Sequence, residues 1–369
     1  YTISNLNIVG DFVGDNNANS IGLFRNVVGA IIRNVHFKDA NVIVSVSESN
    51  DSYTAYHIGV LAGRLEQYTQ VSNVSVEGGI SVTSAYKGNV GGVVGYANEV
   101  NFERVASDIS ISAGGRVGGL IGESNNISLV NGYANVSLQH KEESYIGGLV
   151  GYLGNSRVSN AYATGKITIP DTLDNPWGYG SISGNAWSST FDSVFSYVLR
   201  EDNVTKVRSF NDNSNVIKNS YSTMTETNFE QKTLADILSA LSEVWSVDIW
   251  NFASEYPTLK QAPIVSLTAS DIVEYGFSFD IDLIDIDNVS ELSAVKLYLG
   301  DTLYRELDDL SVLTFDDIKY ATTYKLVVTH AYNYGDSETD TLFDTVLMVR
   351  TADKDNVPEI SFGENSIIV

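Results

Sequence analysis

The chain of 369 residues is acidic, with 22 Lys and Arg against 46 Asp and Glu, a net charge of −24 and no cysteine. This charge repels nucleic acid and anionic membranes, so neither is expected as a partner, and without cysteine the chain forms neither disulfides nor thiolate metal sites. No window reaches the run of about 18 apolar residues that a membrane-spanning helix requires.

A short segment of apolar residues and glycine recurs through the first half of the chain. Its copies are Ile58–Gly63, Val90–Gly95, Val117–Gly122, Ile146–Gly151 and, in outline, Tyr179–Gly184. A second element recurs with the same spacing and has an apolar residue two positions before a polar one, which is Asn at positions 5, 34, 73, 131, 160 and 219 and is replaced by Arg104 and Ser193 in two units. Recurrence at about thirty residues indicates a repeat architecture.

A third element in each unit alternates apolar and polar residues with period two, as in Ile109–Ser112 and Ile167–Ile169. Three short strands per unit, with glycine or asparagine at the corners, predict an all-β, right-handed parallel β-helix over residues 1–228, with about seven coils. Asparagine suits such corners because it tolerates the left-handed conformation. The glycines are expected where the backbone needs a positive φ or has no room for a Cβ. For the aromatic residues of the later coils, Tyr133, Tyr162, Phe195 and Tyr221, the pattern leaves open whether the rings point inward or outward.

The largest insertion in the repeat, residues 170–189, contains Trp177, Tyr179 and Trp187. Loops on one side of a solenoid often carry recognition, so these three residues are candidates for ligand binding. The alternative is that the loop packs its aromatic rings back over the solenoid.

Residues 229–260 are expected to form a cap. Leu234, Ile237, Leu238 and Leu241 have helical spacing, and Trp245, Trp250 and Tyr256 follow them. A helix and aromatic rings placed after the last coil predict a plug for the open end of the solenoid, which would otherwise expose core and strand edges. The chain begins inside a strand pattern with no comparable cap before it, so we expect it to be part of a longer protein.

Residues 261–356 carry seven or so short alternating strands separated by turn signals, which predicts an Ig-like or fibronectin-type-III-like β-sandwich. Tyr320–Tyr324 resembles the tyrosine corner of such domains. Residues 357–369 repeat the first strand of this module and predict the start of a second sandwich. Asp285 and Asp287, near the end of a strand, are candidates for a structural calcium site, although their spacing matches no known calcium loop. No other cofactor is expected.

Ile146–Gly151 together with Val158–Gly165 resembles the GLUG repeat of bacterial surface and secreted proteins, which include large adhesins and the non-catalytic N-terminal regions of IgA-protease-like proteins. Residues 242–259 are similar to the segment that often closes such repeats. The resemblance covers about residues 1–260 and implies a β-helix at a bacterial cell surface; it implies no reaction.

No catalytic motif stands in a supporting context. The four histidines are scattered, and the acidic residues of the coils, among them Glu77 and Asp108, are expected to fall in no single column. We therefore expect a non-enzymatic, extracellular segment of a bacterial surface protein that acts in adhesion or ligand presentation and binds a host or cell-surface protein or glycan. The alternative is an accessory, non-catalytic region of a secreted or wall-bound metalloprotease or carbohydrate-active enzyme.

Overall fold

The structure is a computed structural model that describes residues 1–12, 19–46, 56–83, 88–141, 145–168, 178–200, 214–223, 229–247, 249–260, 264–284, 290–332 and 341–353. Over these residues the chain is nearly all β, with one short helix. It divides into two compact units, Tyr1–Leu259 and Lys260–Val369, so the residues predicted as a cap belong to the first unit, except for Lys260.

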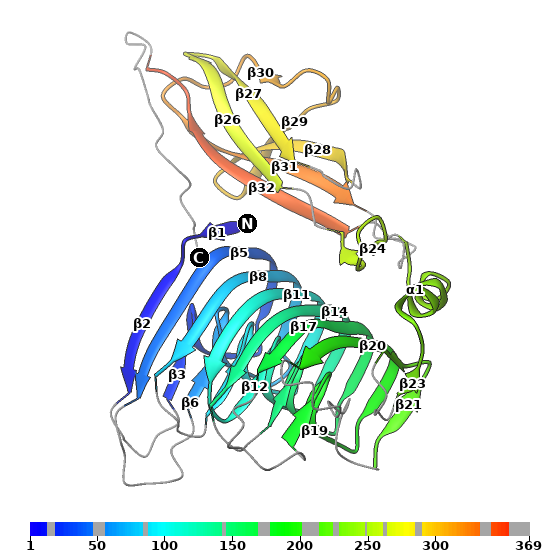
Figure 1. The fold of residues 1–369 in the computed structure, drawn as a ribbon. Coiled ribbons are helices and arrows are strands. Elements are labelled where there is room, and N and C mark those ends of the chain that lie inside the picture. Colours follow the sequence, from blue (N-terminus) through cyan, green and yellow to red (C-terminus); the bar gives the residue numbers. More distant parts are fainter. Residues whose placement is uncertain are drawn as a thin grey trace. The chain divides into compact units, whose positions relative to one another are not determined.

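The first unit is a β-solenoid built from three parallel sheets (Figure 1). Sheet A contains β1 (Thr2–Ser4), β2 (Asn7–Phe12), β5 (Ile31–Val46), β8 (Gln70–Val82), β11 (Asn101–Ala113), β14 (Ser128–His140), β17 (Arg157–Thr168), β20 (Thr190–Arg200), β21 (Val216–Lys218), β22 (Tyr221–Ser222) and β23 (Glu230–Gln231). Sheet B contains β3 (Asn19–Ile21), β6 (Tyr56–Ile58), β9 (Asn89–Gly91), β12 (Arg116–Gly118), β15 (Ile146–Gly147) and β18 (Tyr179–Gly180). Sheet C contains β4 (Phe24–Val28), β7 (Ala62–Glu66), β10 (Val94–Asn98), β13 (Ile121–Asn125), β16 (Val150–Gly154) and β19 (Ser183–Trp187).

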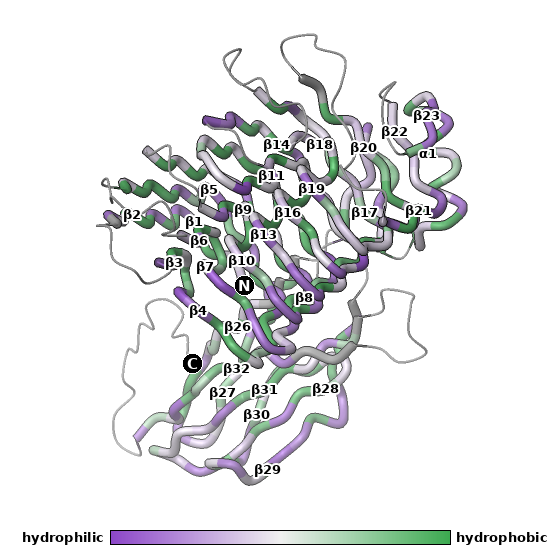
Figure 2. The backbone as a smooth tube through the Cα atoms, turned by 90° about the horizontal axis from the view of Figure 1, so that it is seen from below, coloured by the Kyte–Doolittle hydropathy of each residue, from purple (hydrophilic) through white to green (hydrophobic). Residues whose placement is uncertain are grey.

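Each coil passes through sheets B, C and A in turn, which confirms the prediction of three strands per repeat. Sheets B and C have six strands each, and sheet A continues beyond them at both ends with β1 and β2 and with β21 to β23. Equivalent residues of successive coils pair in register and form columns. One such column, formed by Val93, Leu120 and Leu149, is fully buried. Figure 2 shows apolar and polar segments succeeding each other along the solenoid strands.

The glycine column consists of Gly63, Gly95, Gly122 and Gly151, which lie on sheet C against the backbone of sheet B. A Cβ on Gly122 would lie 2.5 Å from the Val90 amide nitrogen and 2.7 Å from the Gly95 carbonyl oxygen, and one on Gly151 would lie 2.5 Å from the Gly122 oxygen. These glycines do not have positive φ angles. Of the two predicted reasons for the column, lack of room for a side chain is therefore the one that applies.

The corner column within sheet A adopts the left-handed conformation in every coil. The φ angles are 57° at Asn5, 57° at Asn34, 51° at Asn73, 54° at Arg104, 54° at Asn131, 49° at Asn160, 56° at Ser193 and 46° at Asn219. Side chains of the column also form hydrogen bonds between coils: Asn73 Nδ2 donates to Asn34 Oδ1 at 2.9 Å. Asparagine favours this conformation and stacks its amide groups, which explains its recurrence.

The aromatic rings of the later coils point outward, away from the solenoid core. Tyr133 stacks on Tyr162 at 5.1 Å between ring centroids, and Tyr162 stacks on Phe195 at 4.7 Å. Trp245 and Trp250 cover this row, with Trp250 6.0 Å and Trp245 6.2 Å from the Tyr162 ring. The row is consequently buried against the segment that follows the last coil.

That segment contains α1 (Leu234–Ser242), β24 (Trp250–Asn251) and β25 (Thr258–Leu259). The helix confirms the predicted helical pattern, and its first turn is capped by Thr233, whose hydroxyl accepts a hydrogen bond from the Asp236 amide. The predicted end plug is wrong for the aromatic rings, because Tyr162 Oη donates to the Pro257 carbonyl at 2.5 Å and the tryptophans lie over the side of sheet A.

The second unit consists of two antiparallel sheets. The three-stranded sheet has the order β26 (Ile264–Val273), β27 (Gly276–Ile284) and β30 (Thr314–Phe315). The four-stranded sheet has the order β29 (Thr302–Glu306), β28 (Ser290–Leu299), β31 (Thr323–Tyr332) and β32 (Thr341–Arg350). Phe277, Val295 and Leu326 belong to the buried core of this unit. Residues 357–369, predicted to begin another module, lie outside the described residues.

The start of β31 has the geometry expected of a tyrosine corner. Tyr324 is fully buried, and its hydroxyl accepts a hydrogen bond from the Lys319 amide, five residues upstream, at 2.9 Å. Replacing Tyr324 with phenylalanine is expected to lower the stability of the second unit by about 1 kcal/mol, because the Lys319 amide loses its acceptor. Hydrogen exchange of the β31 amides in the whole chain measures this change. Tyr320→Phe is the control, because Tyr320 is 47% exposed, and equal protection in both variants would contradict the prediction.

Candidate functional site

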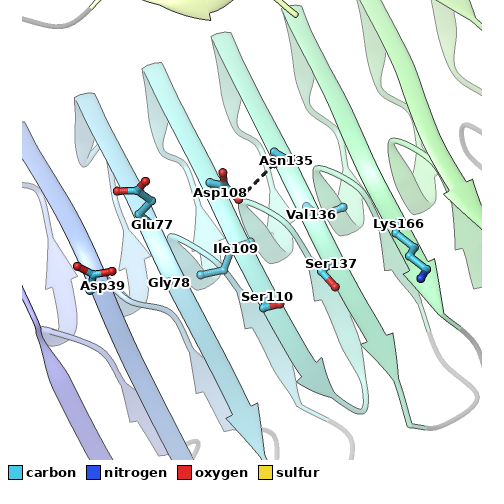
Figure 3. A pocket seen from close by; sticks show the side chains of 10 residues that line it. All are labelled: Asp39, Glu77, Gly78, Asp108, Ile109, Ser110, Asn135, Val136, Ser137 and Lys166. Atoms are coloured by element: carbon cyan, nitrogen blue, oxygen red, sulfur yellow. Dashed lines mark hydrogen bonds between the residues drawn. The ribbon is translucent and has the colours of Figure 1, made fainter. Parts of the chain in front are cut away.

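The outer face of sheet A carries an open groove with a volume of about 570 Å³. Its lining comes from the five neighbouring strands β5, β8, β11, β14 and β17 (Figure 3). The lining residues are Asp39, Glu77, Gly78, Asp108, Ile109, Ser110, Asn135, Val136, Ser137 and Lys166. The groove thus crosses successive coils over four strand spacings of about 4.8 Å each.

Strand alternation produces two rows of outward side chains along the groove. Ile109 and Val136 belong to the solenoid core and are 2% and 4% exposed, so the residues on either side of them point outward. One row is Glu77, Asp108 and Asn135, which are register partners in β8, β11 and β14. The other row is Gly79, Ser110, Ser137 and Lys166. Carboxylates and an amide therefore face hydroxyls and an ammonium group across a floor of backbone.

The first row is linked by hydrogen bonds at one end only. Thr164 Oγ1 donates to Asn135 Oδ1 at 3.2 Å, and Asn135 Nδ2 donates to Asp108 Oδ1 at 3.3 Å. The next position in the row is Glu77, the register partner of Asp108. The expectation that Glu77 and Asp108 share no column is therefore wrong: insertions between the coils hide the register in the sequence.

A third carboxylate joins this end of the groove through a break in the strand register. The pairing of β5 with β8 shifts between Phe37 and Ala40, and Asp39 adopts a left-handed φ of 54° at the shift. A bulge of this kind re-aims a side chain. Figure 3 shows Asp39, Glu77 and Asp108 on three neighbouring strands of the same face.

An aromatic residue borders the carboxylates. Tyr133 is two residues before Asn135 on β14 and so belongs to the same outward face. Burial raises the pKa of Tyr133 to about 12, and the charges of Asp108 and then Glu77 act in the same direction. The phenol is therefore protonated at neutral pH and is a hydrogen-bond donor next to the groove.

In a second polar cluster, between sheets B and C, the side chains pair with one another. Arg116 pairs with Glu123 and lies over the Tyr152 ring at 4.6 Å. Asn89 donates to Glu123 Oε2 at 2.6 Å and bonds His57 Nδ1 at 3.0 Å. The mutual pairing of these groups closes the edge between the two sheets, so we assign this cluster a structural role.

Buried histidines make the stability of the first unit depend on pH. Burial lowers the pKa of His36, His57 and His140 to about 4, below the unfolded value of 6.5. Between these values the unfolded chain binds more protons, so the free energy of unfolding is expected to fall as the pH drops from 6.5 to 4, by up to about 1.4 kcal/mol per pH unit and histidine.

Urea unfolding at several pH values between 7 and 4.5 tests this dependence. His140→Gln removes one of the three groups while keeping a side-chain donor toward the Gly115 carbonyl, which His140 Nε2 contacts at 2.9 Å. Its stability is expected to change less steeply with pH than that of the unaltered chain. Equal slopes would contradict the assignment.

Comparison with known proteins identifies one part of the solenoid. Residues 142–168 match the family model of the GLUG motif. No curated protein and no solved structure matches the chain. The GLUG segment includes β15, β16 and β17, which together form one coil, and Ser137 and Lys166 of the groove are register partners on β14 and β17. The groove therefore includes the last strand of the GLUG segment.

Of the three aromatic residues predicted to bind a ligand, Tyr179 and Trp187 lie among the described residues. Trp177 lies outside the described residues. Tyr179 is the first residue of β18 and the register partner of Ile146. Its side chain is buried in the solenoid core and is 2% exposed. Trp187 ends β19 and is half-buried beside Gly154. A surface ligand therefore cannot contact the face of the Tyr179 ring.

Asp285 and Asp287, the predicted calcium ligands, lie outside the described residues. Within the part of the chain that the structure describes, no group of three or more His, Asp or Glu side chains is arranged to hold a metal ion. No helix among the described residues is long and apolar enough to cross a membrane.

Proposed function

We propose that this chain is a non-catalytic segment of a bacterial cell-surface protein that acts in adhesion, with the groove on sheet A as its binding face. The observation that carries the proposal is the open row of carboxylate, amide and hydroxyl groups across five coils. Such a face offers many hydrogen bonds to an extended polar ligand, and its exposure to solvent suits binding better than chemistry that must exclude water. The GLUG match over residues 142–168 supports the surface location, as this motif resembles repeats of surface proteins.

We further propose that the solenoid is a right-handed β-helix and that the second unit is an Ig-like, fibronectin-type sandwich serving as a spacer. Crossover connections between parallel strands of one sheet are right-handed in about 98% of cases. The sheet orders β26-β27-β30 and β29-β28-β31-β32, together with the Tyr324 hydrogen bond to Lys319, support the sandwich.

A binding screen of the whole chain against a glycan array and a panel of host cell-surface proteins tests the adhesion proposal. Binding to at least one glycan or protein, with no chemical change of the bound molecule, is expected. Binding to neither class would leave a purely structural stalk, and turnover of the ligand would contradict a non-catalytic role.

A further inference from the structure

The groove holds two carboxylates that face each other across coils, whereas other acidic residues of the coils face an amide or a base. Glu103 accepts a hydrogen bond from Asn131 and Asp192 accepts one from Asn219, while Arg116 pairs with Glu123. Glu77 and Asp108 are instead like charges in direct register on adjacent strands. Within the described residues, Glu77 and Asp39 have no ion pair or hydrogen bond.

Like charges directly opposite each other destabilise a sheet. Arrangements that break such a rule without a compensating contact are expected at functional sites. Asp108 accepts one hydrogen bond, from Asn135, and Glu77 accepts none among the described residues, so further donors or a positive charge above the two carboxylates would compensate their repulsion. Both side chains are exposed and are therefore accessible to a ligand.

The position of the groove on a sheet face determines what kind of molecule can supply the donors. The backbone groups of β8, β11 and β14 are already paired between coils. An extended peptide, which relies on main-chain hydrogen bonds at a sheet edge, would find no backbone partners on this face. A chain with hydroxyl groups along its length can use the side chains alone, since Ser110, Ser137 and Asn135 each donate and accept.

We propose that the groove binds a linear, polyhydroxylated glycan that lies along the solenoid axis and donates hydrogen bonds to Glu77 and Asp108. This inference rests on the proposed adhesive function and specifies its ligand. Free amino groups on the glycan strengthen binding through attraction to the three carboxylates, and acidic sugars are repelled by them. The Ser110 and Ser137 row, opposite, contacts the other edge of the sugar rings.

Titration calorimetry of the whole chain with three hexasaccharides tests the ligand class. The probes are a glucosamine hexamer, which is cationic, an N-acetylglucosamine hexamer, which is neutral, and a galacturonate hexamer, which is anionic. We expect the neutral and cationic hexamers to bind, with only the cationic one weakened by added salt, and the anionic hexamer to bind at least about tenfold more weakly than the neutral one. Equal binding of the anionic hexamer would overturn the proposal.

The double variant Glu77→Gln, Asp108→Asn tests the site. It keeps the shape of both side chains and is expected to weaken binding of the cationic hexamer by at least about tenfold, because charge-assisted hydrogen bonds are lost. Glu230→Gln is the matched control, because Glu230 is an exposed acidic residue of sheet A outside the groove. Its affinity should equal that of the unaltered chain, and an equal affinity for the double variant would place binding elsewhere.

Thermal unfolding of the double variant separates a binding role from a structural one. Removal of two like charges in register should leave the melting temperature unchanged or raise it. A lower melting temperature would show that the carboxylates stabilise the fold and would overturn the proposal. Absence of binding by all three hexamers would overturn it as well, while protein ligands in the host-protein screen would still support the adhesive function.

Discussion

Replacing Gly122 with alanine is expected to lower the free energy of unfolding of the solenoid by about 3 kcal/mol, through overpacking. The added Cβ would lie 2.5 Å from the Val90 amide nitrogen and 2.7 Å from the Asn89 carbonyl carbon. Both are backbone atoms of sheet B, held by pairing on either side, so they cannot move aside without breaking the ladder. The damage should spread to neighbouring coils, because their glycines occupy the same gap.

Gly79→Ala is the matched control for this prediction. Gly79 lies on β8, also within the solenoid, and the nearest atom to an added Cβ is the Ser110 carbonyl oxygen at 3.6 Å, an ordinary contact. Urea unfolding followed by circular dichroism should show a large loss of stability for Gly122→Ala and little change for Gly79→Ala. Similar midpoints for the two variants would mean that sheets B and C are not as close as described.

Removal of the Trp250 side chain is expected to destabilise the first unit by about 4 kcal/mol. The indole is 1% exposed and lies 4.4 Å from the Trp245 ring between centroids. Its Nε1 donates to Asn131 Oδ1 at 3.3 Å, which ties it to the corner column of the fourth complete coil. Trp250→Ala removes this hydrogen bond and uncovers the rings of Tyr133 and Tyr162.

Val247→Ala serves as the control, because Val247 lies three residues away in the same segment and is 60% exposed. Chemical unfolding should separate the two variants by several kcal/mol, and exposure of the Tyr162 ring can be followed by its accessibility to a tyrosine-modifying reagent. An unchanged stability of Trp250→Ala would contradict a role for the tryptophans in holding the coils.

The repeat itself could be predicted from the sequence because its physical causes are local. A corner that requires a left-handed residue selects asparagine, and a gap without room for a Cβ selects glycine, so both recur at each coil. Even the coils with Arg104 and Ser193 in place of asparagine keep the positive φ, with values of 54° and 56°. A second left-handed corner, between sheets C and A, includes Glu99, Asn126, Asn155 and Ser188.

Features that depend on contacts between distant residues could not be predicted in the same way. Alternation places the Tyr162 side chain on the face of sheet A opposite to that of its small neighbours. Which of the two faces is turned toward the solenoid core depends on the tryptophans that cover Tyr162. Predicting the groove requires knowing that Glu77 pairs with Asp108. The intervals between repeats vary too much for these two residues to be aligned by counting. The bulge at Asp39 adds a further residue that no periodicity shows.

The aromatic cover also sets an order of events for a chain that is synthesised from its N-terminus. Pairing between coils joins residues about one repeat apart, so the early coils can close as they emerge. Tyr162 and Pro257, however, are 95 residues apart, and Asn131 and Trp250 are 119 residues apart. The aromatic rings on the outer face of the later coils therefore remain exposed to solvent until the end of the first unit has been synthesised. A chain that ends before Trp250 is therefore expected to expose the stacked rings of Tyr133 and Tyr162 to solvent.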